Sequence, residues 1–214
     1  MIIGHNSRIL TATSEDPVQK KLTDTMRIGL LACCTLALLL TGRAIAQVPA
    51  ERQPLPPMKI PDRGELVLAG DDVTYRPWST DHNPDKVHII QYFAGTMSAS
   101  KTFEPFTDLL QGSFEEGSYH VTTIINLDAA TWGTTGFVVS EVKANKRKFP
   151  LATMVLDEDG SGARQWELGK KGAGLAIIDR EGIVAYFTRK ALSDTELRAA
   201  LELVGTLIRD NAVR

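Results

Sequence analysis

The stretch KVHIIQYFAGTMSASKTFEPFTDLL, residues 86–110, decides the fold because it places a strand, a turn and a helix start in immediate succession. Residues 87–93 are apolar, β-branched or aromatic except for His88 and Gln91. A short run of this composition is typical of a central strand that is covered on both faces. Gly95 follows the run, so we expect the chain to turn there.

A helix is expected after the turn, beginning within residues 98–101. The hydroxyl of Ser98 or Ser100 can accept a hydrogen bond from a backbone N–H group at its start. Pro105 falls inside this helix, where it lacks an N–H donor and its ring clashes with the preceding turn, so we predict a kink. The apolar face is predicted from four residues at helical spacing: Phe103, Phe106, Leu109 and Leu110.

This succession resembles the redox corner of the thioredoxin superfamily, in which a strand leads to W-C-x-x-C, a basic residue and a helix kinked by proline. The C-x-x-C positions fall on residues 97–100, which are Met-Ser-Ala-Ser, the basic residue on Lys101 and the proline on Pro105. Both cysteines are absent. Because dithiol chemistry needs a low-pKa thiolate and a resolving thiol, we expect no thiol redox activity and no cofactor.

The first 46 residues are interpreted as segments outside the folded domain. Residues 26–46 have the pattern of a secretory signal peptide: a basic start at Arg27, an apolar run over 28–40, and small residues before a cut after Ala46. Residues 1–25 are then an upstream extension, with Met26 as the start; a long n-region is the alternative. The apolar run continues beyond Cys33, which disfavours lipidation at that cysteine.

The predicted cut also decides the cysteine content, because Cys33 and Cys34 are the only cysteines in the chain. The mature protein would enter an oxidising compartment without a disulfide. Its 168 residues can build one ordinary core. They carry 19 Lys and Arg against 23 Asp and Glu, a net charge of about −4, which argues against nucleic acid and anionic membrane surfaces as partners.

The mature chain divides into an extended, Pro-rich lead-in over 47–61 and one α/β domain over 62–214. Further strands are predicted at 65–68, 73–75, 119–127, 152–156, 163–168, 175–179 and 183–187, and helices at 137–148 and from Ser193 onward. A turn at 62–64 should lead into the first strand, the first two strands should form a hairpin, and residues 157–160 should be a hairpin turn. The basic run at the end of the 137–148 helix is interpreted as a solvated helix end.

The closing hairpin and last helix again resemble thioredoxin. Aligning the turn at 180–182 with the family puts Gly174 at the place of the cis-proline, which presents a backbone edge to the substrate. The loss of this proline implies that the family's substrate site has changed together with the cysteines.

Five motifs, taken with their order and spacing, resemble one family more specifically, the YtfJ family of bacterial periplasmic proteins. They are IPDRGELVL at 60–68, AG-x-x-SA at 94–99, TTIIN-x-D at 122–128, NK followed by FP at 145–150, and D-x-x-G at 179–182. The resemblance implies a cysteine-free periplasmic protein with a thioredoxin-like three-layer fold: a central mixed β-sheet, flanking helices and an N-terminal β-hairpin. The family has no settled activity.

Two classes of function remain open. The first is a binding module that holds a periplasmic protein or a small anionic ligand on the former active-site face. Its candidate residues are Thr96, Ser98, Ser100, Lys101 and Gly174. Free N–H groups at a helix start, hydroxyls and an ammonium suit an anion; hydroxyls that only cap the helix are the alternative. After signal cleavage no membrane contact is expected.

The second class is an enzyme of non-thiol chemistry, such as a hydrolase that uses Ser98 or Ser100. A serine nucleophile needs a base and an orienting acid within hydrogen-bond reach. The mature histidines are His82, His88 and His120, and no spacing ties them to either serine or to a metal site. A carboxylate, Asp128, follows the 119–127 strand where ligands of open α/β sheets bind, although a turn or cap is the plainer interpretation.

Overall fold

The central strand is β3 (Val87–Ala94), and all its residues are buried. The computed structural model describes residues 46–70, 72–81 and 85–212, which belong to one compact unit. The predicted extension and signal peptide lie outside these residues, apart from Ala46. β3 pairs in parallel with β4 (Tyr119–Asn126) and antiparallel with β6 (Gly174–Ile178). The stretch that was expected to organise the fold therefore holds its central strand.

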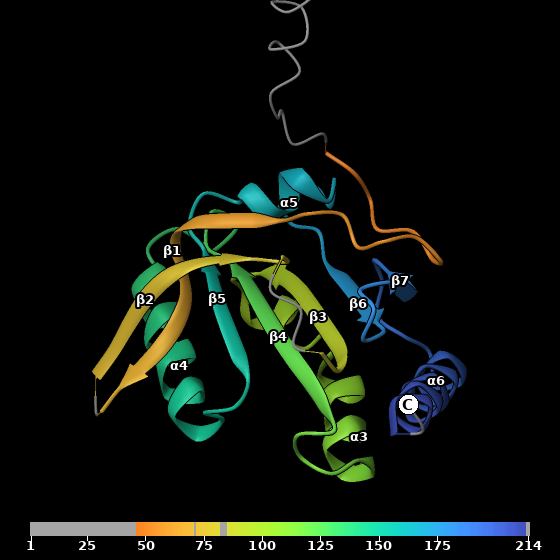
Figure 1. Ribbon diagram of the computed structural model, residues 1–214. Coiled ribbons are helices and arrows are strands. Elements are labelled where there is room, and N and C mark those ends of the chain that lie inside the picture. Colours follow the sequence, from red (N-terminus) through yellow and green to blue (C-terminus); the bar gives the residue numbers. More distant parts are fainter. Residues whose placement is uncertain (1–45, 71, 82–84, 213–214) are drawn as a thin grey trace, which may run out of the picture. The chain divides into compact units, whose positions relative to one another are not determined.

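Within the described residues, seven strands form one mixed sheet in the order β2-β1-β5-β4-β3-β6-β7 (Figure 1). The other strands are β1 (Lys59–Ala69), β2 (Asp72–Ser79), β5 (Thr153–Asp157) and β7 (Val184–Thr188). β1 and β2 are the predicted N-terminal hairpin, and β3, β4 and β5 run parallel. The predicted α/β, thioredoxin-like architecture, with a mixed central sheet and flanking helices, is confirmed.

Five helices follow in the described part of the chain: α2 (Met97–Ser100), α3 (Glu104–Ser113), α4 (Thr135–Lys148), α5 (Ser161–Gln165) and α6 (Asp194–Ala212). A capping box opens α6: the backbone N–H of Ser193 donates to Glu196 Oε2 at 2.7 Å, and the N–H of Glu196 donates to Ser193 Oγ at 3.4 Å. In the same part of the chain no helix has the length and hydropathy needed to cross a bilayer.

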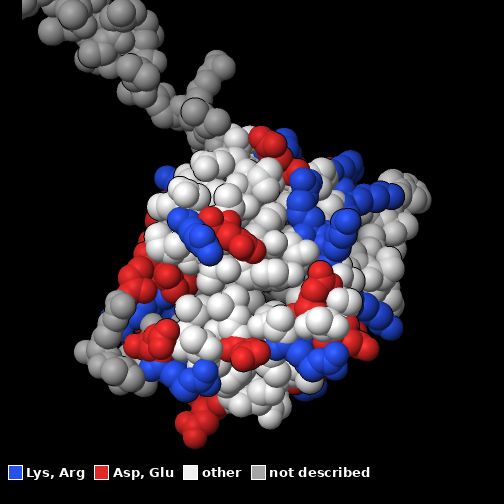
Figure 2. All heavy atoms as spheres, turned by 90° about the vertical axis from the view of Figure 1, so that its right-hand side faces the viewer, with Lys and Arg blue, Asp and Glu red and all other residues white. Residues whose placement is uncertain are grey.

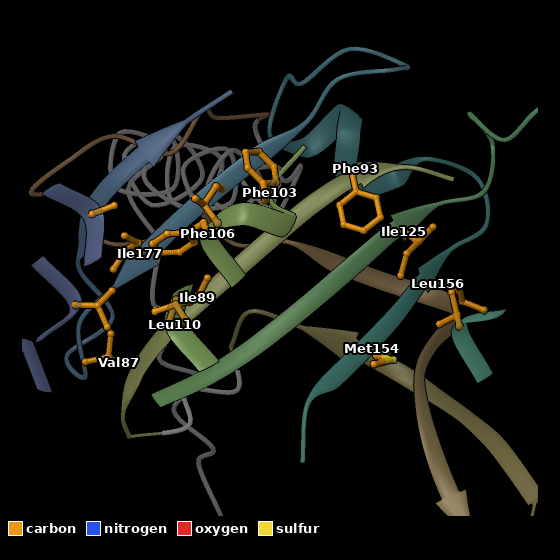
Figure 3. Close-up of a cluster of buried hydrophobic side chains, with 14 of the residues drawn as sticks. Val87, Ile89, Phe93, Phe103, Phe106, Leu110, Ile125, Met154, Leu156 and Ile177 are labelled. Carbon is orange, nitrogen blue, oxygen red and sulfur yellow. The ribbon is translucent and has the colours of Figure 1, made fainter. Parts of the chain in front are cut away.

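Apolar side chains pack on both faces of the sheet because strand residues alternate between them. Val87, Ile89 and Phe93 of β3 join a core that includes Phe106 of α3 and Val204 of α6. Figure 3 shows how side chains from the helices and from several strands meet in this core. A second core contains Ile90 and Tyr92 of β3 with Trp166 after α5 and Met58 of the lead-in.

The helix after β3 differs from the prediction. α2 ends at Ser100 and α3 begins at Glu104, so Pro105 lies in the first turn of α3 and not in a helix interior. Proline is well suited to this position because the first N–H groups of a helix have no partner within it. The predicted kink is wrong: the chain makes two helices. Leu109, expected on the apolar face, is 40% exposed, whereas Phe106 and Leu110 are buried.

The segment after β5 was also predicted incorrectly. Residues 161–165 form α5, not the start of a strand over 163–168, and residues 157–160 lead into a helix and not a hairpin. The cause is Asp157, whose carboxylate accepts hydrogen bonds from the backbone N–H groups of Ser161 and Gly162 at 2.9 Å each. A buried carboxylate that binds the first N–H groups of a turn favours a helix start.

The lead-in is part of the fold. It contains no helix, as expected, but its last residues belong to β1, and the predicted turn at Gly64 is a bulge within that strand. Gly64 has φ +71°, and a Cβ at this position would lie 2.2 Å from the carbonyl oxygen of Arg76. Earlier residues contact distant elements: the N–H of Arg52 donates to Val184 O at 2.8 Å.

The basic run at the end of α4 is only partly solvated. Lys146 is 6% exposed, and its Nζ donates to the carbonyl oxygens of Pro150 and Ala152 at 3.0 and 2.7 Å. Burial lowers the pKa of this ammonium. Lys146 therefore binds the loop between α4 and β5, and the interpretation of the whole run as a solvated helix end is wrong for this residue.

Candidate functional site

The four C-x-x-C positions, residues 97–100, form the whole of α2, which follows β3 after a short turn. We refer to residues 96–101 as the α2 corner. Thr96, not either serine, caps α2: its backbone is extended and its Oγ1 accepts the N–H of Ala99 at 3.3 Å. Ser100 Oγ donates to the carbonyl oxygen of Met97 at 3.0 Å, and Ser98 Oγ lies 3.5 Å from Thr96 Oγ1. The hydroxyls of this corner bond within the turn.

The structure brings four of the five candidate residues together. Thr96, Ser98 and Ser100 share one turn with Lys101, which is exposed at the end of α2. Gly174 is instead the buried first residue of β6, where it pairs with Tyr92. No cis peptide bond occurs among the described residues, so Gly174 lacks the backbone geometry of the proline whose place it takes.

The structure separates the two described histidines from the serines. His88 Nε2 lies 2.8 Å from Thr122 Oγ1, and His120 Nε2 lies 3.0 Å from Thr153 Oγ1. Ala94 lies six positions beyond His88 along β3, about 20 Å at roughly 3.3 Å per residue, and α2 follows Ala94. His82 lies outside the described residues. Neither described histidine is in reach of Ser98 or Ser100 as a general base.

A pocket lies beyond the carboxyl ends of β4 and β5. It has a volume of about 420 Å³, and its wall includes Asn126 and Asp128 at the end of β4 and Gly160 and Arg164 of α5 and its cap. Glu167, Gly169 and Lys170, from the turns that follow α5, complete the wall with Ala163. Figure 1 shows β3, β4 and β5 side by side, with α5 at the end of the sheet where they finish. Ligands of open α/β sheets bind at this end.

The buried carboxylate of Asp157 holds one wall of the pocket in place. Asp157 is 0% exposed, and its Oδ2 accepts the hydroxyl of Tyr92 at 2.6 Å in addition to the N–H groups of α5. Tyr92 in turn accepts the N–H of Ala163 at 3.0 Å. Burial, together with the charge of Asp157, raises the pKa of Tyr92, so the phenol remains a donor at neutral pH. The Tyr92–Asp157 pair therefore fixes α5, one wall of the pocket, to the sheet.

Among the polar side chains that line the pocket, that of Asn126 is buried and the others are exposed. Asn126 is 1% exposed, and its Nδ2 donates to the carbonyl oxygen of Lys170 at 3.0 Å. Its Oδ1 is buried and has no hydrogen-bond partner among the described residues. Gly160, with φ +72°, lies against this amide. A Cβ at this position would lie 3.2 Å from Oδ1.

The pocket adjoins the α2 corner. The N–H of Gly95 donates to the carbonyl oxygen of Asn126 at 2.8 Å, so the turn after β3 is bonded to the end of β4. The sequence singled out Asp128 at this end of the sheet, and the structure places it on the pocket rim, where Lys170 Nζ lies 3.2 Å from its Oδ2. Asn126, Gly160 and Lys170 were missed as site residues, because they come from three separate segments that only the fold brings together.

The fold that holds this site defines the class of protein as thioredoxin-like. A solved structure of Mycobacterium tuberculosis AhpC is similar, with a TM-score of 0.50 over 76% of this chain and 95% of that chain. The two sequences are 13% identical, so the likeness concerns the fold alone.

Sequence comparison identifies the family. The model of a bacterial protein family of unknown function, YtfJ_HI0045, matches residues 50–207. An uncharacterized protein of Haemophilus influenzae is 32% identical over 158 residues, which cover 73% of this chain and 86% of that protein. The uncharacterized protein YtfJ of Escherichia coli strain K12 is 30% identical over 173 residues, which cover 80% of this chain and 94% of that protein. The chain belongs to the YtfJ family.

Proposed function

We propose that the protein is exported to the periplasm and acts there as a thioredoxin-like binding module without thiol redox chemistry. The observation that carries this proposal is the composition of α2, which holds Met97, Ser98, Ala99 and Ser100 at the C-x-x-C positions and bonds its hydroxyls locally. A dithiol mechanism needs a thiolate and a resolving thiol. α2 offers neither, while the fold around it is kept.

Export is supported by the signal-like pattern of residues 26–46. The proposed cut falls directly before Gln47, which belongs to the described fold. The backbone nitrogen of Gln47 donates to the carbonyl oxygen of Gln165 at 2.8 Å, so the first residue after the proposed cut is already bound to α5. A cut after Ala46 leaves every described strand of the sheet in place and removes both cysteines.

The proposed binding surface is the carboxyl-end face, which we define as the α2 corner together with residues 126–132 and α5. Two exposed large apolar side chains, Met97 at 68% and Trp132 at 98%, lie on the segments that follow β3 and β4. Methionine and aromatic side chains are enriched in the cores of protein interfaces. They favour a protein as the partner at the α2 corner, with a small anion held by Lys101 as the alternative.

Nucleic acid is not proposed as a partner. The mature chain would carry a net charge of about −4. Figure 2 shows the face on the side of β7 and α6, where Lys and Arg lie beside Asp and Glu. A nucleic-acid surface would need clustered positive charge.

Chemical crosslinking of the mature protein, residues 47–214, in a periplasmic extract tests the proposal. We expect the Ser98→Ala/Lys101→Ala variant to lose the captured partner by roughly tenfold or more, because interface energy concentrates in a few residues. The yield of each crosslinked species, measured by quantitative mass spectrometry, gives the comparison.

The matched control is Ser113→Ala/Lys86→Ala, which removes an exposed serine and an exposed lysine at the opposite end of the sheet. This control should retain the partner. Equal capture by all three proteins would place the contact away from the α2 corner. Capture by none would contradict a protein partner and favour the small anion.

A further inference from the structure

We infer that the pocket at the ends of β4 and β5 binds a small zwitterion of the α-amino acid type, in which an ammonium lies beside a carboxylate. The inference rests on the proposed function, because it names a ligand class for the carboxyl-end face. Its starting point is Asn126 Oδ1, a buried acceptor that has no partner among the described residues.

The orientation of the Asn126 amide is fixed by its neighbour. Its nitrogen must face the carbonyl oxygen of Lys170, which is only an acceptor, at 3.0 Å. The other amide atom is therefore the oxygen, and a buried acceptor without a donor is destabilising because it has lost its bonds to water. Asn126 lines the pocket. A ligand that satisfies it must bring an N–H or O–H donor.

The rim of the pocket carries both signs of charge. Asp128 and Glu167 supply carboxylates, and Arg164 and Lys170 supply cations. Lys170 Nζ is 3.2 Å from Asp128 Oδ2, so an acceptor and a donor stand side by side next to the Asn126 amide. An anion alone would leave Asn126 Oδ1 without a donor, and a cation alone would face Arg164 and Lys170. A zwitterion matches both: its ammonium suits Asn126 Oδ1 and Asp128, and its carboxylate suits Lys170 and Arg164.

The rim pairs can exchange partners at little cost. The Lys170 and Asp128 side chains are 64% and 43% exposed, and exposed ion pairs contribute little to stability. Arg164 donates to Asp159 through Nη1 and Nη2, at 2.6 and 2.7 Å, which leaves further N–H donors of its guanidinium for a ligand carboxylate. Neither cation has to leave a buried partner.

The size and rigidity of the pocket suit a small ligand. Its volume of about 420 Å³ lies in the range of small-molecule sites. The α5 wall is fixed by Asp157, which accepts the N–H groups of Ser161 and Gly162. A wall that is fixed before binding lowers the entropy lost when a ligand is held.

The test uses the mature protein and the twenty standard L-amino acids as probes, each added singly and followed by protein-observed NMR and calorimetry. For each binder, the N-acetyl derivative removes the ammonium and the carboxamide removes the carboxylate. We expect at least one amino acid to bind, and both derivatives to bind at least tenfold more weakly. Asp128→Asn and Lys170→Met should each weaken binding of the free amino acid at least fivefold.

Lys171→Met is the matched control, because Lys171 is the exposed neighbour of Lys170 and does not line the pocket. It should leave the affinity unchanged. Equal binding of the N-acetyl derivative would overturn the inference in favour of an anion site, and equal binding of the carboxamide in favour of a cation site. No binding at millimolar concentrations would also overturn it and leave Asn126 to a water molecule.

Amino-acid binding in the pocket and partner capture at the α2 corner can fail independently of each other. Ser98→Ala/Lys101→Ala should bind the amino acid normally, since neither residue lines the pocket. If that variant loses its protein partner while the pocket binds nothing, the binding module stands and the zwitterion fails. If the pocket binds and the α2 corner captures nothing, the ligand class stands and the protein partner fails.

Discussion

Replacing Asp157 with asparagine is expected to lower the free energy of unfolding by about 2–5 kcal/mol. The carboxylate is 0% exposed and accepts hydrogen bonds from the Tyr92 hydroxyl, the Ser161 N–H and hydroxyl, and the Gly162 N–H. An amide has one acceptor oxygen, so its NH₂ group would face donors that then have no partner. Urea unfolding of the mature protein, followed by circular dichroism, measures the loss.

Asp159→Asn is the matched control for this change. Asp159 also accepts the N–H of Ser161, at 3.0 Å, and pairs with Arg164, but its side chain is 51% exposed. Water can replace the lost bonds there, so the expected cost is below about 1 kcal/mol. A similar loss in both variants would mean that Asp157 is no more important than an exposed cap, and that α5 is not fixed through it.

Replacing Phe106 with alanine is expected to cost about 3–5 kcal/mol of unfolding free energy. The ring is 0% exposed and lies in the core that α3 and α6 form with the sheet (Figure 3). Truncation removes apolar contact and leaves a cavity that close-packed neighbours fill only in part. The same urea experiment gives the size of the effect.

Leu109→Ala, on the same helix, is the control. Leu109 is 40% exposed, so its truncation should cost no more than about 1 kcal/mol. If Leu109→Ala were as costly as Phe106→Ala, Leu109 would lie on the buried face of α3, as its spacing predicted, and its exposed position in the structure would be wrong.

The hydrophobic pattern was sufficient for the sheet and insufficient for the short helices. β3 and β4 are runs of apolar and β-branched residues, and such runs predict buried strands directly. α5 could not be predicted in this way, because a short apolar run such as residues 163–168 fits a strand and a helix equally well. The carboxylate that starts α5 belongs to Asp157, and it is held in place by the hydroxyl of Tyr92, 65 residues earlier in the chain.

Pro105 illustrates a boundary error. The same proline is disruptive in a helix interior and favourable in a first turn, so its effect depends on where the helix begins. The spacing of Phe103 and Phe106 suggested one helix from Ser98 onward. The structure begins a new helix at Glu104, and both rings remain buried.

The candidate site was predictable only where the resemblance to thioredoxin supplied a register. The α2 corner could be placed because a strand, a turn, Lys101 and Pro105 follow in order. Asn126 was part of a strand motif, but its partners Gly160 and Lys170 lie 34 and 44 residues further on. Only the folded arrangement shows that its oxygen has no donor among the residues that the structure describes.

The intact mass and thiol count of the protein recovered from the periplasm test the central claim most directly. We predict a chain that begins at Gln47 and titrates no thiol under denaturing conditions, because the cut removes Cys33 and Cys34, the only cysteines of the sequence. A folded protein that keeps residues 26–46 and titrates two thiols would contradict the cut and the cysteine-free mature chain, and a protein found only in the cytoplasm would contradict the export.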